Sequence, residues 1–199
     1  MGEEALLLPT DTYLKAGIHI GTKFKTRYMG KFIYKTRPDG LSVLNLQEID
    51  RRMSIAAQML ANYEPQDILI ISRREGSFKA LKKMQELAGF KIFPGRYPPG
   101  VLTNPELENF LEVKIVFVSD PWTDRSAVLD AFRAGVPIIG CCDTNNQTNM
   151  IDLAVPCNNK GKKSLGIMFY LITREYMVKR GLIKNGEEFS AKIDDFTEE

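Results

Sequence analysis

The sequence has few of the residues on which common catalytic and metal sites depend. Its 199 residues include a single histidine, His19, and three cysteines, of which Cys141 and Cys142 are adjacent. An odd count with two neighbouring cysteines does not fit a disulfide framework, so we expect all three to be small buried apolar side chains. No cysteine or acid stands at ligand spacing from His19, which argues against a zinc site and against a histidine-based nucleophile set.

Long apolar runs are also missing. No run reaches eighteen apolar residues, so we expect no membrane span. The acidic start Met1-Gly2-Glu3-Glu4 does not fit a secretory signal, which needs positive charge before an apolar run. The apolar fraction of 44% suffices for a sizeable core. We therefore expect a cytoplasmic chain with one domain, residues 1–199.

Glycine-rich phosphate motifs are the third absence. Neither G-x-G-x-x-G nor G-x-x-x-x-G-K-[ST] follows an apolar run. We expect no cofactor, no metal, no catalytic residue and no small-molecule substrate. Asp120 and Asp143 follow two of the apolar runs and could hold a magnesium ion, but capping of turns and helix starts is the favoured interpretation.

Three short runs rich in isoleucine and valine organise the chain. They occupy residues 67–72, 114–119 and 136–141. Their continuous apolarity is typical of strands buried on both faces. Helical patterns at Ser77–Leu87, at Arg125–Ala134 with Phe132 as a core candidate, and from Ser164 to about Arg180 alternate with them. The alternation predicts an α/β fold with a doubly wound parallel sheet and helices on both faces.

The ends of the chain differ from this core in composition. Residues 32–35 and 41–44 are β-prone and flank the turn Arg37-Pro38-Asp39-Gly40, which predicts a β-hairpin. We divide the domain into a basic N-terminal extension with this hairpin, residues 1–45, an α/β core, 46–184, and an acidic mobile tail, 185–199. The segment Pro94–Asn109 is a long proline-rich loop, and such loops usually have a function or a partner.

Positive charge is concentrated in two segments although the net charge is only +2. Residues 10–37 and 156–184 each hold seven basic residues and one acid. Aromatic residues stand between the first set of cations, an arrangement suited to neutralising phosphates and stacking on bases. Solvated surface charge is the alternative. The candidate RNA-binding residues are Lys23, Lys25, Arg27, Lys31, Lys35, Arg37, Arg73, Arg74, Arg96, Lys160, Lys162 and Lys163.

Several motifs together resemble a known family. They include Ala16-Gly17-Ile18-His19-Ile20-Gly21, Pro99-Gly100-Val101-Leu102-Thr103-Asn104, Gly135-Val136-Pro137-Ile138-Ile139-Gly140, Asp143-Thr144-Asn145 and Pro156-Cys157-Asn158-Asn159-Lys160-Gly161. In this order, over residues 9–181, they resemble the family of the second protein of the small ribosomal subunit. The short acidic tail, and the lack of room for a coiled-coil insertion in residues 45–63, resemble its archaeal members.

The resemblance implies a flavodoxin-like (Rossmann-like) fold without catalysis. It also implies a place in the small (30S) ribosomal subunit, with ribosomal RNA and neighbouring small-subunit proteins as partners. Two alternatives stay open from the residues alone. One is a nucleotide- or small-molecule-binding enzyme on the same fold, and the other is a metal-dependent hydrolase that uses Asp120 and Asp143.

Overall fold

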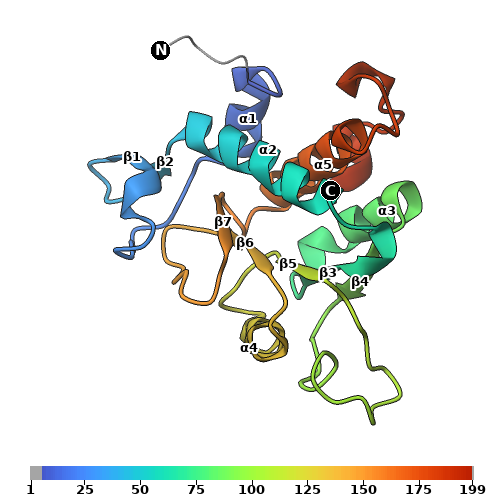
Figure 1. Cartoon of the computed structure of the whole chain (residues 1–199). Helices are drawn as coiled ribbons and strands as arrows, with labels where there is room; N and C mark the ends of the chain where they lie inside the picture. Colours follow the sequence, from blue (N-terminus) through green and yellow to red (C-terminus); the bar gives the residue numbers. More distant parts are fainter. Residues whose placement is uncertain (1–5, 199) are drawn as a thin grey trace.

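A five-stranded parallel sheet forms the centre of the computed structural model, which describes residues 6–198 (Figure 1). Its strands lie in the order β4-β3-β5-β6-β7. Counted within the sheet this is 2-1-3-4-5, the flavodoxin-like order. The predicted fold class is therefore confirmed. The strands are β3 (Ile68–Ser72), β4 (Lys91–Pro94), β5 (Ile115–Val118), β6 (Ile138–Cys142) and β7 (Leu153–Pro156).

The three central strands are buried on both faces, as their continuous apolarity predicts. Successive side chains of a strand point to opposite faces, so Ile68 and Ile70 of β3 join one core cluster while Leu69 and Ile71 join another. All residues of β3, β5 and β6 are buried. The three cysteines, which are free, lie buried in the first cluster, as expected.

Helices cover the two faces unequally. On one side lie α1 (Thr10–Ala16), α2 (Leu46–Ala61), α3 (Phe78–Ala88) and α5 (Lys162–Lys179), and on the other lies α4 (Arg125–Ala134) (Figure 1). Helix α5 is buried on all sides from Ser164 to Tyr176, because α2, α3 and the C-terminal tail surround it. The predicted burial of Phe132 on α4 is wrong, since this side chain is 59% exposed.

The proline-rich loop between β4 and β5 occupies the face where a doubly wound fold usually has a second helix. Tyr97, Val101 and Leu102 are buried in the same cluster as α4. The Asp130 carboxylate of α4 accepts hydrogen bonds from the Tyr97 hydroxyl at 3.2 Å and from the Gly100 backbone N–H at 2.6 Å. This loop is therefore fixed by a buried polar centre rather than by regular structure.

The predicted N-terminal hairpin is present. Strands β1 (Ile33–Thr36) and β2 (Ser42–Leu44) pair antiparallel in a sheet of their own. Gly40 ends the turn at φ = 86°, a conformation that glycine adopts without steric cost. Asn45 caps α2, its side chain accepting a hydrogen bond from the Gln47 backbone N–H at 3.0 Å.

The acidic tail differs from the mobile segment expected from its composition. It forms two short 3-10 turns, Gly186–Glu188 and Ile193–Phe196. Phe189 and Phe196 are buried against Tyr170 of α5, with ring centroids 5.3 and 5.6 Å from that ring. Two aromatic side chains thus fix a segment whose charge suggests mobility, because their burial outweighs the cost of ordering a short chain.

The docking of this tail depends on Gly166. A Cβ atom at this position would lie 2.6 Å from Thr197 Oγ1 and 3.0 Å from the Phe196 carbonyl oxygen. We expect Gly166→Ala to weaken tail docking by about 1–3 kcal/mol through overpacking, although alanine favours a helix. Hydrogen exchange of residues 186–198 should become faster. The control is Gly30→Ala, in which the added Cβ meets no atom within 4 Å, so the tail should exchange as in the wild type. Unchanged protection of the tail in Gly166→Ala would contradict the role of Gly166 in docking the tail.

Candidate nucleic-acid interface

The carboxyl ends of all five parallel strands lie along one border of the sheet, which we call the carboxyl edge. The predicted cations outside the N-terminal extension follow these ends in three groups. Arg73 and Arg74 follow β3, Arg96 follows β4, and Lys160, Lys162 and Lys163 follow β7. Parallel pairing therefore brings together cations that are far apart in the sequence.

The basic loop of residues 18–31 is held to this edge by hydrogen bonds. Thr26 donates its backbone N–H to the Thr144 carbonyl oxygen at 2.9 Å, and its hydroxyl donates to the Asn146 carbonyl oxygen at 2.7 Å. The Thr22 backbone N–H donates to Thr144 Oγ1 at 2.9 Å. Residues 143–146 follow β6, so the loop is fixed to the sheet although the sequence shows it only as an irregular basic segment.

Gly21 permits this close contact. A Cβ at this position would lie 2.4 Å from Thr144 Cγ2 and 2.9 Å from the Ser42 carbonyl oxygen. The Gly21 N–H also donates to that carbonyl at 2.9 Å. A side chain here would separate the basic loop from both the hairpin and the sheet.

A shallow cavity of about 560 Å³ lies between the basic loop and the hairpin, and we call it the basic groove. Three of the predicted cations, Lys25, Arg27 and Lys35, line it, together with Tyr34, which is 70% exposed. No carboxylate is among its lining residues. These are Lys25, Thr26, Arg27, Gly30, Ile33, Tyr34, Lys35 and Thr36.

The other predicted RNA-binding cations of the extension, Lys23, Lys31 and Arg37, belong to the same basic loop and hairpin turn. The Lys31 ammonium lies 5.0 Å from the centre of the Phe32 ring. Lys23 is exposed beside the hairpin turn at Gly40, and Arg37 forms an exposed ion pair with Asp39 at 3.4 Å. An exposed pair of this kind contributes at most about 1 kcal/mol, so it can open when a phosphate competes.

The interleaved aromatic residues divide into two roles. Phe24, Tyr28 and Tyr34 are 50–80% exposed and can contact a partner. Phe32, in contrast, is 2% exposed and belongs to the core cluster. The single histidine adds no positive charge to this surface, because burial lowers the pKa of His19 below its ordinary value of 6.5 and favours the neutral imidazole at pH 7.

Two predicted RNA-binding cations at the carboxyl edge form internal ion pairs. Arg74 pairs with the buried Asp120, and the Lys160 ammonium lies 2.9 Å from Asp143 Oδ2. Asp120 also accepts hydrogen bonds from the Trp122 backbone N–H and the Asn146 side-chain amide. Both aspartates thus stabilise turns, the interpretation favoured from the sequence. Within residues 6–198 there is no group of three or more potential metal ligands.

The point where the strand order reverses, between β3 and β5, is the usual ligand crevice of this fold. Here three buried serines of that region bond to one another. The Ser72 hydroxyl oxygen lies 2.7 Å from that of Ser77 and 2.5 Å from that of Ser119. These hydroxyl groups thus form hydrogen bonds within the fold.

Asp124 is an exception among these buried polar groups. Burial, reinforced by the nearby Asp120, raises its pKa from 3.8 to about 6, while a hydrogen bond from the Arg73 backbone N–H opposes the shift. One of its carboxylate oxygens, Oδ1, is buried without a hydrogen-bond partner within residues 6–198. A raised folded-state pKa means that folding favours the protonated form, so stability from this group falls as pH rises through 6.

We therefore expect Asp124 to lower the free energy of unfolding by about 1 kcal/mol between pH 5 and pH 7. In Asp124→Asn this contribution disappears, so the variant should lose less stability than the wild type over that range. Denaturant unfolding at both pH values measures the difference. The exposed Asp39→Asn is the control, and identical pH dependence in Asp124→Asn and the wild type would contradict the prediction.

Sequence reasoning identified the cations but missed the residues that position them. Thr22, Thr26, Thr144 and Asn146 carry no charge, and only the motif Asp143-Thr144-Asn145 could have drawn attention to the β6 loop. Trp122 and Arg125, exposed after β5 at the same edge, were not assigned to the interface either.

Comparison with known proteins agrees with this architecture. The family model described as Ribosomal protein S2 matches residues 13–112 and 112–177. Similar proteins named small ribosomal subunit protein uS2 come from Methanococcus maripaludis strain C6, Picrophilus torridus and Nanoarchaeum equitans. They are 48%, 45% and 42% identical over 198, 196 and 190 residues, which is 100%, 98% and 96% of this chain and 89%, 98% and 94% of the relatives. The chain belongs to the ribosomal protein S2 family, and these relatives are archaeal.

Proposed function

We propose that this chain is a structural constituent of the small ribosomal subunit, where it binds ribosomal RNA through the basic groove and the adjoining carboxyl edge and supports translation in the cytoplasm. The observation that carries the proposal is the basic groove, in which Lys25, Arg27 and Lys35 surround one cavity without a carboxylate. Membership of a ribosomal protein family gives the partner its identity.

The groove suits the backbone of a folded RNA. Its cations neutralise phosphates and release counterions, which gives affinity without reading sequence. The exposed Tyr34 ring offers a surface for stacking. Because hydrogen bonds to Thr144 and Asn146 already hold the loop, binding need not pay the full cost of ordering it.

The other predicted cations extend this surface. Arg73, Arg96 and Lys163 are exposed along the carboxyl edge, and Lys162 stands at the start of α5. Arg74 and Lys160 contribute to RNA binding only if their ion pairs with Asp120 and Asp143 open or accept a phosphate alongside. We rank them below the residues of the basic groove for this reason.

Neighbouring small-subunit proteins are the second class of proposed partner. The proline-rich loop exposes residues 103–106, while Tyr97 and Gly100 are bound to Asp130 beneath them. A rigid exposed loop of this kind suits a protein contact, because little conformational entropy is lost on binding.

The enzyme alternatives receive no support. The family is one of ribosomal proteins, not of enzymes.

No helix within residues 6–198 combines the length and apolarity needed to cross a membrane.

We further propose that residues 1–199 form one domain. One core cluster includes Tyr13 of α1, Phe32 beside the hairpin, and Phe196 of the tail. The extension, the α/β core and the tail each contribute side chains to this one cluster, which supports the proposal.

Reversal of charge in the basic loop tests the proposal. We expect the triple variant Lys23→Glu, Lys25→Glu, Arg27→Glu to fold normally, because all three side chains are exposed, and to be lost from small subunits. Sucrose-gradient sedimentation of lysates with detection of the chain measures incorporation, and far-UV circular dichroism checks folding.

The control variant Lys82→Glu, Arg133→Glu, Lys184→Glu makes the same charge change at exposed positions on α3, on α4 and after α5. It should be incorporated like the wild type. Normal incorporation of the basic-loop variant would refute the assignment of the groove. A wild-type chain that never sediments with small subunits would refute the proposed function itself.

A further inference from the structure

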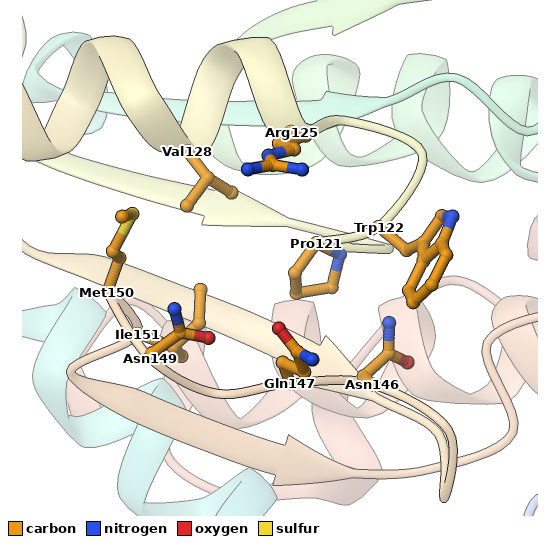
Figure 2. Close-up of a pocket in the computed structure, with 9 residues that line it drawn as sticks. All are labelled: Pro121, Trp122, Arg125, Val128, Asn146, Gln147, Asn149, Met150 and Ile151. Carbon is orange, nitrogen blue, oxygen red and sulfur yellow. The ribbon is translucent and has the colours of Figure 1, made fainter. Parts of the chain in front are cut away.

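A second cavity of about 330 Å³ opens at the carboxyl edge, between the turn after β5 and the loop from β6 to β7. Figure 2 shows Arg125 and Val128 of α4 on one side, Gln147 and Asn149 on the opposite side, and Trp122 at one end. Its lining residues are Pro121, Trp122, Arg125, Val128, Asn146, Gln147, Asn149, Met150 and Ile151.

The floor of this cavity is built on Gly140 of β6. A Cβ at Gly140 would lie 3.0 Å from Pro121 Cγ and 3.2 Å from two carbon atoms of Ile151. These two side chains therefore pack directly over the strand. They give the cavity an apolar floor that belongs to the sheet and does not depend on mobile surface side chains.

The walls carry polar side chains whose hydrogen-bonding groups are not used within the part of the chain that the structure describes. The side chains of Arg125, Gln147 and Asn149 form no hydrogen bond or ion pair with any residue from 6 to 198. The Trp122 indole is 66% exposed. The cavity therefore offers a large aromatic face, a guanidinium and two amides, and no carboxylate is among its lining residues.

Met150 closes the end opposite Trp122 (Figure 2). It is the one residue other than glycine with a positive φ, 78°, in the part of the chain that the structure describes. A left-handed conformation costs a residue with a side chain about 1–2 kcal/mol. Hydrogen bonds on both sides hold it, from Ile151 N–H to the Thr148 carbonyl and from Asp152 N–H to the Ile138 carbonyl. Strain of this kind is concentrated at binding sites.

We propose that this cavity binds a single unpaired nucleobase of RNA. The inference rests on the proposed function and adds a site to it. Trp122 stacks on the base, the Arg125 guanidinium stacks on it or contacts the adjoining phosphate, and the amides of Gln147 and Asn149 bond to its polar edge. Amide side chains donate and accept hydrogen bonds, as the edges of bases require, and unpaired bases are what proteins read in RNA.

RNA suits the site better than a protein segment does. The volume is at the small end of ligand cavities, which fits one ring and not a run of side chains. The cavity also shares Asn146 with the anchor of the basic loop, whose Thr26 hydroxyl donates to the Asn146 carbonyl oxygen. A strand whose phosphates lie in the basic groove can therefore direct a base toward the cavity along the same edge.

The test uses the fact that Trp122 is the only tryptophan of the chain. Intrinsic tryptophan fluorescence of the full-length protein thus reports on this cavity alone. Titration with single-stranded hexa-adenylate RNA should quench the emission saturably, because a stacked base contacts the indole directly. A hexamer of abasic ribose phosphate, with equal charge, should leave it unchanged. Quenching by both hexamers alike, or by neither, overturns the inference.

Binding of fluorescein-labelled hexa-adenylate supplies the second measurement. We expect Trp122→Ala to weaken binding about tenfold, a typical loss for one base stacked on an aromatic ring, and Arg125→Ala to weaken it several-fold. The matched controls on α4 are Phe132→Ala, which removes an aromatic ring of 59% exposure, and Arg133→Ala. Both should bind like the wild type.

The outcomes separate this inference from the proposed function. Incorporation into small subunits combined with wild-type RNA binding by Trp122→Ala overturns the nucleobase site alone. If the Trp122 fluorescence is quenched by purified small-subunit proteins but not by RNA, the nucleobase site is also refuted and the cavity is a protein contact. The basic-loop triple variant should bind RNA more weakly and with a smaller dependence on salt. If Trp122→Ala lowers the affinity by the same factor in that variant as in the wild type, the groove and the cavity contribute separately to binding.

Discussion

Parallel pairing of the buried strands β3, β5 and β6 is the constraint on which the rest of the structure depends. Because these strands run in the same direction, every loop that follows a strand emerges at the carboxyl edge. The turn at Arg73, the cavity beside Trp122 and the start of α5 are therefore neighbours along one border. Apolar side chains on both faces of these strands fix this arrangement.

The polar groups at this edge divide into those that hold the loops and those that remain available. Asp120, Asp143 and Asn146 are buried and bonded to backbone groups or to the cations Arg74 and Lys160. Burying an unpaired charge is costly, so these pairs are part of the fold. Among the described residues, no carboxylate forms an ion pair with the cations of the basic groove. These cations can neutralise a phosphate, and the buried network already fixes the basic loop beside which they lie.

Two segments without regular structure complete the core. The proline-rich loop replaces a helix on the α4 face. There the Asp130 carboxylate accepts hydrogen bonds from the Gly100 backbone N–H and the Tyr97 hydroxyl of the loop. The tail covers α5, where Phe189 and Phe196 pack against Tyr170. In both cases a few buried contacts fix a segment that composition describes as irregular. The molecule thereby gains rigid surfaces next to its sheet, which suits assembly into a larger particle.

The sequence by itself determined the strands, the hairpin, most helix bounds and the identity of the basic residues, because apolar period, turn residues and charge are local properties. It also carried the family motifs. Only the tertiary structure decided that Lys25, Arg27 and Lys35 share a groove, that Arg74 is paired, that Phe132 is exposed and that the tail is docked. These outcomes depend on which distant segments meet, as Thr26 meets Thr144, and spacing along a chain does not specify contacts between residues over a hundred positions apart.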